Sequence, residues 1–164
     1  MAKQERLIET RNDLSKKTRA GVVALLDERL LDAIALKLQA KQAHWNVKGP
    51  NFIALHELFD KVADVAEQAT DLLAERSVQL GGQPVGGAKA VAAGSRLTPY
   101  PLTAADGLAH VDALSSALAQ FGALVREGID QADRLGDKDT ADLFTEISRD
   151  ADKYLWFVEA HRQK

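Results

Sequence analysis

The apolar residues of this chain recur at the spacing of an α-helix over most of its length. From about Gly21 they return at every fourth position, which places them on one face of a helix. This stripe consists of Val22, Leu26, Leu30, Ile34 and Leu38, and it is widened by Val23, Leu25, Leu31 and Leu36. A stripe of this width predicts a helix that runs to about Lys48 and buries more than one side.

Glycine, proline and short polar residues separate this helix from three more. Pro50 cannot continue a helix and Asn51 can cap the next one, so a break is expected here between the first and second helices. Thr103 and Asp106 resemble a capping box, which predicts that a helix starts soon after them. The apolar spacing then predicts helices over about 52–80, 108–135 and 140–160, with a turn at 136–139.

The connection after the second helix is long for a compact domain. It runs from Gly81 to about Leu102 and is rich in glycine and proline, which predicts a crossover that contains a short helix over 88–93. Four long helices with one long connection between the second and third are typical of a ferritin-like four-helix bundle. We therefore expect an all-α chain with a polar arm over 1–19 and a bundle domain over 20–164.

Composition and charge narrow the function. The formal net charge of -3 is too small for a wholly basic nucleic-acid binder, so any electrostatic function must be local. The absence of cysteine excludes disulfides and thiolate metal sites, and leaves nitrogen and oxygen as metal ligands. The first twenty residues lack the apolar centre of a signal peptide, and no apolar run looks long enough to cross a membrane. We therefore expect a cytoplasmic protein with no membrane partner.

The second helix carries the most informative polar residues. At about 100° per residue, His56, Asp60, Asp71 and Glu75 fall opposite the arc that should face the core. That predicted core arc consists of Leu55, Leu58, Val62, Val65, Ala66, Ala69, Leu72 and Leu73. A metal site inside the bundle would usually need a Glu-x-x-His pair, which the sequence lacks. The potential ligands therefore point out of the subunit.

These four residues form two pairs, His56 with Asp60 and Asp71 with Glu75, each spanning one helical turn. The pairs lie roughly 16 Å apart along the helix, too far apart to share an ion. A second, antiparallel copy of the helix across a two-fold axis would bring unlike pairs together and form two equivalent sites. His44 can add a nitrogen ligand to each site. The small residues Ala63 and Ala74 would let the two helices approach closely. Asp64 and Glu67 would lie on the same face. The alternative is a solvated acidic face without a site.

These residues resemble the Dps family, the DNA-binding proteins from starved cells, also described as miniature ferritins. The likeness begins with the stretch 41–53 and covers nearly the whole chain after the arm. It continues through His56-Glu57, Asp60, Asp71, Ala74-Glu75-Arg76, Gln79-Leu80-Gly81-Gly82, Asp139-Thr140-Ala141-Asp142, Ser148-Arg149-Asp150 and Asp152-Lys153-Tyr154-Leu155-Trp156-Phe157. The spacing His-x11-His-x3-Asp-x10-Asp-x3-Glu is specific.

The resemblance implies a hollow dodecamer with iron-oxidising sites at its two-fold interfaces. His44, His56 and Asp60 would come from one subunit, and Asp71 and Glu75 from its partner. It also implies hydrogen peroxide as the oxidant, storage of ferric mineral, and protection of DNA from oxidative damage. The mixed carboxylate and imidazole set suits iron(II) and iron(III), whereas zinc would occupy the same ligands without changing valence and would inhibit.

Three further assignments keep an alternative. Trp45 is an electron donor by resemblance, or a buried packing aromatic. By the same resemblance, Asp137, Asp142 and Glu146 line an iron-entry pore; the alternative is that they stabilise a helix N-terminus. The basic residues of the arm bind DNA and place the protein at the nucleoid, or are simply solvated. Those basic residues are Lys3, Arg6, Arg11, Lys16, Lys17 and Arg19. If DNA compaction were the main function, metal binding would be incidental.

Overall fold

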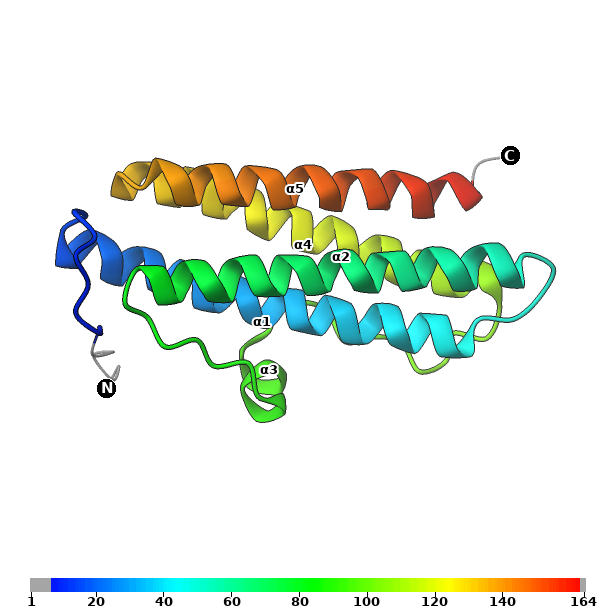
Figure 1. Cartoon of the computed structure of the whole chain (residues 1–164). Helices are drawn as coiled ribbons and strands as arrows, with labels where there is room; N and C mark the ends of the chain where they lie inside the picture. Colours follow the sequence, from blue (N-terminus) through cyan, green and yellow to red (C-terminus); the bar gives the residue numbers. More distant parts are fainter. Residues whose placement is uncertain (1–6, 163–164) are drawn as a thin grey trace.

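Four long helices and one short helix make up the chain in the computed structural model, which describes residues 7–162 (Figure 1). The elements are α1 (Lys16–Asn46), α2 (Phe52–Gln79), α3 (Ala88–Gly94), α4 (Gly107–Leu135), α5 (Lys138–Glu159) and a closing 3-10 turn, η1 (Ala160–Arg162). No residue in the described range forms a strand. The all-α bundle with a short helix in its long crossover is therefore confirmed.

The helices pack as two antiparallel pairs. α1 lies against α2 and α4 against α5, while α1 also packs on α4 and joins the two pairs (Figure 1). α3 stands outside the bundle and contacts α1. The crossover is fixed to α1 by the buried Asp32, whose carboxylate accepts hydrogen bonds from the Ser95 hydroxyl at 3.1 Å and the Arg96 backbone N–H at 2.6 Å.

Side-chain caps set where α1, α4 and α5 begin and correct three predicted boundaries, whereas Asn51, expected to cap α2, forms no side-chain cap hydrogen bond. Ser15 accepts from the backbone N–H of Thr18, so α1 begins at Lys16 rather than at Gly21 and includes the last residues assigned to the arm. Asp106 caps α4 directly, so Thr103 forms no capping box. Asp137 caps α5, which therefore begins before the predicted Thr140. A short polar side chain at each start satisfies a backbone donor that has no partner in the helix.

The buried face of α2 differs slightly from the predicted arc. Phe59 and Ala63 belong to the core, and Ala63 is only 2% exposed, so it cannot ease the approach of a second copy. Leu72, predicted to be buried, is 36% exposed. The face opposite the core still carries His56, Asp60, Asp71 and Glu75, the first two half-buried and the last two exposed. α2 therefore presents the predicted polar residues away from its own bundle.

Part of the predicted arm is fixed to the bundle. The backbone N–H of Ile8 donates to the carbonyl of Gly81 at 2.8 Å, and Arg19 donates to the carbonyls of Leu14 and Leu80. Gly81 has a φ of +88°, and a Cβ there would lie 2.4 Å from the Ile8 carbonyl oxygen, so a side chain has no room. The end of α2 is thus a docking point for residues just before α1.

α4 is more apolar than expected. Contrary to the prediction that no segment could span a membrane, α4 is long and apolar enough to do so by length and composition. However, 56% of its most apolar window is buried inside the bundle. Its apolar surface packs on α1 and α5, as in the core helix of a bundle.

Candidate metal centre

His44 and His56 hold each other in one orientation. The Nδ1 of His44 lies 2.8 Å from the backbone carbonyl of His56, and the Nδ1 of His56 lies 2.9 Å from the backbone carbonyl of His44. The two rings stack with centroids 3.7 Å apart. The end of α1 and the first turns of α2 therefore form a two-histidine unit closed by reciprocal hydrogen bonds.

This arrangement decides which ring nitrogens can bind a metal ion. A carbonyl oxygen only accepts, so each Nδ1 must carry the hydrogen and donate it. In a neutral imidazole the other nitrogen, Nε2, then has a free lone pair. A metal-binding histidine usually has its second ring nitrogen fixed by such a hydrogen bond. Both histidines are therefore prepared to bind through Nε2.

Asp60 lies beside this unit and is paired with a lysine. Its Oδ1 is 2.5 Å from the Nζ of Lys41 and 3.9 Å from the Nδ1 of His44. The hydrogen bond from Lys41 lowers the pKa of Asp60, so the carboxylate is ionised at neutral pH. Its side chain is 46% exposed, which leaves it accessible from outside. The sequence did not single out Lys41, although its position one turn before His44 on α1 places both on one face.

Asp71 and Glu75 lie near the other end of α2 and are exposed. Within residues 7–162 no three His, Asp or Glu side chains come close enough together to hold a metal ion. One subunit thus presents a histidine-containing group and a separate acidic pair. A complete site needs further ligands from outside this chain.

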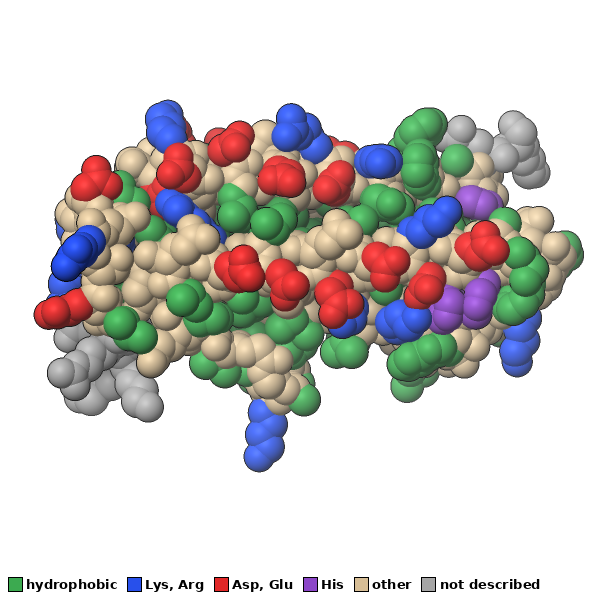
Figure 2. All heavy atoms as spheres, in the orientation of Figure 1, with side chains coloured by type: hydrophobic (Ala, Val, Ile, Leu, Met, Phe, Trp, Pro, Cys, Tyr) green, Lys and Arg blue, Asp and Glu red, His purple; other side chains and the backbone are tan. Residues whose placement is uncertain are grey.

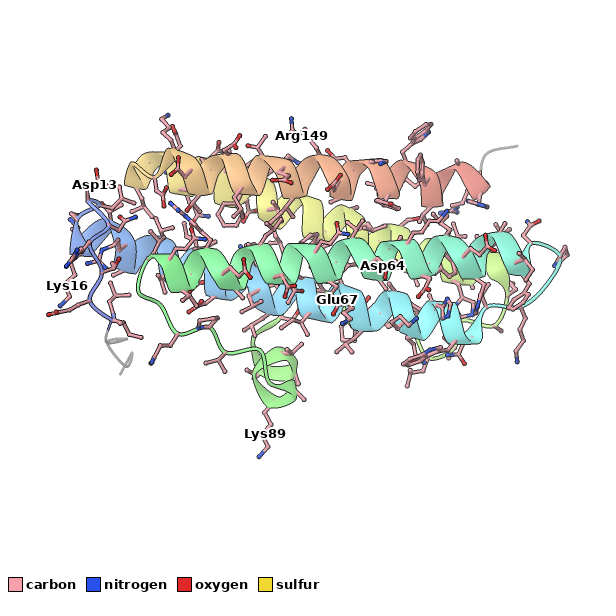
Figure 3. All side chains as sticks on the ribbon, viewed as in Figure 1. Asp13, Lys16, Asp64, Glu67, Lys89 and Arg149 are labelled. Atoms are coloured by element: carbon pink, nitrogen blue, oxygen red, sulfur yellow. The ribbon has the colours of Figure 1, made fainter. Side chains whose placement is uncertain are left out.

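The outward side of α2 is strongly acidic. Figure 2 shows a row of acidic side chains along this helix, with the two histidines near one end of the row. Figure 3 labels two of them, Asp64 and Glu67, which project from α2 into solvent. Lys37 pairs with Glu67 at 2.7 Å, but Asp64 has no hydrogen bond or ion pair within the described part of the chain. Such a face attracts cations and would repel a second copy unless cations lay between them.

Trp45 follows His44 and is 67% exposed. The alternative that it is a packing aromatic in the subunit core is therefore wrong. Its role as an electron donor stays a prediction.

The predicted pore residues at the start of α5 fall into two groups. Asp137 is 2% exposed and is bound by Arg76, whose Nη2 lies 2.9 and 3.1 Å from its two oxygens. Burial alone would raise the pKa of Asp137, but hydrogen bonds from Thr140 and Arg76 outweigh it and lower the pKa. Asp137 is thus engaged inside the subunit. Asp142 and Glu146 are exposed on α5, and the pore prediction now depends on them.

The basic arm residues are also placed unequally. Lys3 and Arg6 lie outside the described residues. Arg11, Lys16 and Lys17 are exposed, and Figure 3 shows Lys16 at the end of the bundle where α1 begins. Arg19 is half-buried and uses its guanidinium to hold backbone carbonyls. It is therefore committed to the fold rather than free for a phosphate.

Comparison with known proteins agrees with this architecture. A family model described as a ferritin-like domain matches residues 23–164. The DNA protection during starvation protein of Agrobacterium fabrum is 44% identical over 155 residues, covering 94% of this chain and 96% of that protein. Among solved structures, Dps of Mycobacterium smegmatis superposes with a TM-score of 0.91 at 31% identity, covering 97% of this chain and 96% of that one. Dps of Microbacterium arborescens in the high iron form gives 0.86 at 31% identity, covering 96% and 100%. With its outward-facing histidines and carboxylates, its bundle and these relatives in agreement, the chain belongs to the Dps family of ferritin-like proteins.

Proposed function

We propose that this protein oxidises iron(II) at sites shared by two copies of the chain and stores the ferric product inside a hollow homo-oligomer, a dodecamer. The observation that carries the proposal is the division of ligands over one outward helix face. His44 and His56 are oriented for metal binding, yet no complete site exists among the described residues of one subunit. Two-fold pairing supplies the missing carboxylates.

Each site takes His44, His56 and Asp60 from one subunit and Asp71 and Glu75 from its partner. Iron is the substrate. Imidazole nitrogen together with carboxylate oxygen suits both of its valences, and the negative carboxylates favour the more highly charged product. The ionised Asp60 must exchange its bond with Lys41 for one with the incoming cation. Zinc binds the same ligand types but keeps its valence, so it acts as an inhibitor.

Hydrogen peroxide is the proposed oxidant, because it accepts two electrons and a pair of iron(II) ions supplies them. Consuming both reagents together prevents formation of hydroxyl radicals and so protects DNA. Asp142 and Glu146 are proposed to draw iron(II) through a pore of the shell by local negative charge. The high iron form described for the Microbacterium arborescens relative supports iron as the cargo. The proposed location is the cytoplasm.

Subunit mixing tests the shared site directly. Asp60→Ala and Glu75→Ala each disable one half of every site, so each homo-oligomer should lose iron oxidation. In a mixed dimer, one site receives both substitutions and the other receives none. Random mixing of dimers should therefore restore about a quarter of the wild-type number of sites.

A matched control uses Asp64→Ala, which removes an exposed carboxylate from the same face of α2. It should keep wild-type oxidation alone, and mixing it with either inactive variant should give no more intact sites than its own subunits supply. Oxidation is followed by absorbance after peroxide is added to anaerobically loaded protein. Failure of the mixed oligomers to regain any activity, with native mass showing that they form, would exclude a shared site.

DNA binding is a second candidate function, suggested by the role in DNA protection for which the Agrobacterium fabrum relative is named. Arg11, Lys16 and Lys17 are exposed, and many arms on one shell would give multivalent, salt-sensitive contacts with phosphates. Such binding would place the protein at the nucleoid. Because Lys16 and Lys17 belong to α1, substitution by glutamine tests them better than deletion.

The double substitution should weaken gel retardation of DNA at low salt. Lys89→Gln is the control, since Lys89 projects from α3 far from this end of the bundle (Figure 3). Equal retardation by both proteins would show that Lys16 and Lys17 do not bind DNA.

A further inference from the structure

Tyr100 and His110 form a closely bonded pair that the proposed iron site does not use. The Tyr100 hydroxyl lies 2.5 Å from the Nδ1 of His110, and the two rings are inclined by only 20°. His110 belongs to α4 and is 0% exposed, while Tyr100 is half-buried in the segment that leads into that helix. A phenol and an imidazole held this closely can pass a proton between them.

The surroundings indicate where the proton lies. Burial lowers the pKa of His110, against smaller opposing effects of Asp106 and the Asn46 backbone, so the ring is neutral at neutral pH. His110 Nε2 has no hydrogen-bond partner of good geometry within residues 7–162. The Asn46 backbone acts to raise the pKa of His110, as a carbonyl that accepts from the ring does, and this favours hydrogen on Nε2. Nδ1 is then the acceptor, and Tyr100 donates to it.

The pair lies at the same end of the bundle as the two site histidines. His110 faces the backbone of Asn46, two residues after His44 on α1. The first residue of α4, Gly107, packs so closely that a Cβ there would lie 3.0 Å from Leu55, which precedes His56. Only the end of α1 and the start of α2 therefore separate the pair from the histidine side of the site.

We infer that Tyr100 is a redox-active electron donor, which gives one electron to hydrogen peroxide when only one iron(II) is bound and passes its phenol proton to Nδ1 of His110. The inference rests on the proposed iron oxidation. Peroxide needs two electrons and two protons to become two waters. Iron(II) supplies one electron and becomes iron(III), Tyr100 supplies the other and becomes a neutral tyrosyl radical, and the solvent supplies both protons.

The position of the base distinguishes Tyr100 from the other oxidisable side chains. An oxidised phenol is a very strong acid, so losing an electron is far easier when a base can take the proton. Burial raises the pKa of Tyr100 to about 12, so the phenolate does not form beforehand and electron and proton must leave together. Burial disfavours the charged form of His110, and Asp106 and the Asn46 backbone offset part of that cost. The hydroxyl of Tyr154 has no hydrogen-bond partner among the described residues, and Trp45 is largely exposed.

The chain contains only two tyrosines, which gives a matched control. Protein loaded anaerobically with one iron(II) per site is mixed with peroxide, frozen within milliseconds and examined by electron paramagnetic resonance. Wild-type protein and Tyr154→Phe should show a tyrosyl radical, and ring-deuterated tyrosine should narrow its spectrum. Tyr100→Phe should lose the radical but keep wild-type oxidation with two irons per site, because two irons supply both electrons.

His110→Gln keeps a polar side chain without a base and should also lose the radical. A radical that persists in Tyr100→Phe, or iron oxidation without any tyrosyl signal in wild-type protein, would overturn the inference and leave the proposed function intact. Absence of any iron oxidation in wild-type protein would overturn both. The deuterium test on the unaltered chain identifies the radical as a tyrosyl whether or not a variant folds, and a radical retained in Tyr154→Phe assigns it to Tyr100.

Discussion

The histidine end and the acidic end of α2 are held in different ways within one subunit. At the histidine end, His44 and His56 fix each other through two backbone carbonyls, and Asp60 is held by Lys41. At the acidic end, no hydrogen bond or ion pair holds Asp71 or Glu75 within residues 7–162, and both are exposed. The side chains at the histidine end are oriented before subunits assemble. Those at the acidic end can be oriented only by the groups that they contact on assembly.

The acidic end is nevertheless anchored one residue further along. Arg76 follows Glu75 and is 11% exposed, with its guanidinium bound to Asp137 and Thr140 at the start of α5. This contact fixes the backbone of α2 while leaving the two carboxylates free to turn. We conclude that the fold positions the acidic pair through the helix and not through its side chains.

The largest expected effect comes from breaking this anchor. Asp137→Ala leaves a nearly buried arginine without its partner and removes the cap of α5, which should lower the free energy of unfolding by about 3–5 kcal/mol. Denaturant unfolding measures the loss. Hydrogen exchange should increase at the end of α2 and the start of α5 and stay unchanged around His44. Asp139→Ala is the control, because Asp139 is 86% exposed and should change stability by less than about 0.5 kcal/mol.

The stability that the Arg76–Asp137 contact contributes should fall in acid. The pKa of Asp137 is lowered in the folded chain, so its contribution is complete above the ordinary carboxyl value of 3.8 and is lost as the pH falls through the lower folded value. The stability difference between wild-type protein and Asp137→Asn should therefore be constant near neutral pH and shrink in acid. Unfolding curves between neutral pH and strong acid measure it, and a difference that grew in acid would contradict the sign.

Removing ligands tests whether the two ends matter equally. His56→Ala removes a proposed ligand and one of the reciprocal hydrogen bonds, so it should reduce iron oxidation more than about 100-fold and also loosen His44. Glu75→Ala should reduce oxidation comparably but leave the histidine unit unchanged. The difference is visible in the imidazole NMR signals of His44 in metal-free protein. If the His44 signals were the same in both variants, the orientation of His44 would not depend on His56, and the histidine end would not be preorganised.

The helical period of the sequence predicted the four long helices and the outward direction of the candidate ligands, because both depend on residues close together in the chain. It misplaced Ala63 and Leu72, because the buried face of α2 is turned toward Phe59 and Ala63 and away from Leu72. Leu72 instead lines a groove between α2 and α5, together with Glu146. Whether a residue at the edge of the buried face is covered depends on how the neighbouring helices pack against it.

The polar contacts that hold the site were not predictable in this way. Lys41 and Asp60 are 19 residues apart in sequence, and Arg76 and Asp137 are 61 apart. Periodicity indicates the face on which a charged side chain lies, but not which element it reaches. The reciprocal bonding of His44 and His56 likewise needs the turn between α1 and α2 to bring the two backbones together. Spacing alone therefore identified the candidate ligands but not the residues that hold them in place.

The smallest expected effect concerns Lys41, which holds Asp60 before a metal ion arrives. Lys41→Met keeps most of the side chain's length but removes its charge, so an incoming cation no longer has to displace it. A partly exposed ion pair contributes about 0.2–1 kcal/mol, so iron(II) should bind up to about five times more tightly. Anaerobic titration measures this affinity. Lys37→Met is the matched control, because it removes the neighbouring pair with Glu67 without touching a proposed ligand. Weaker binding in Lys41→Met than in Lys37→Met would mean that the lysine orients Asp60 for the metal instead of competing with it.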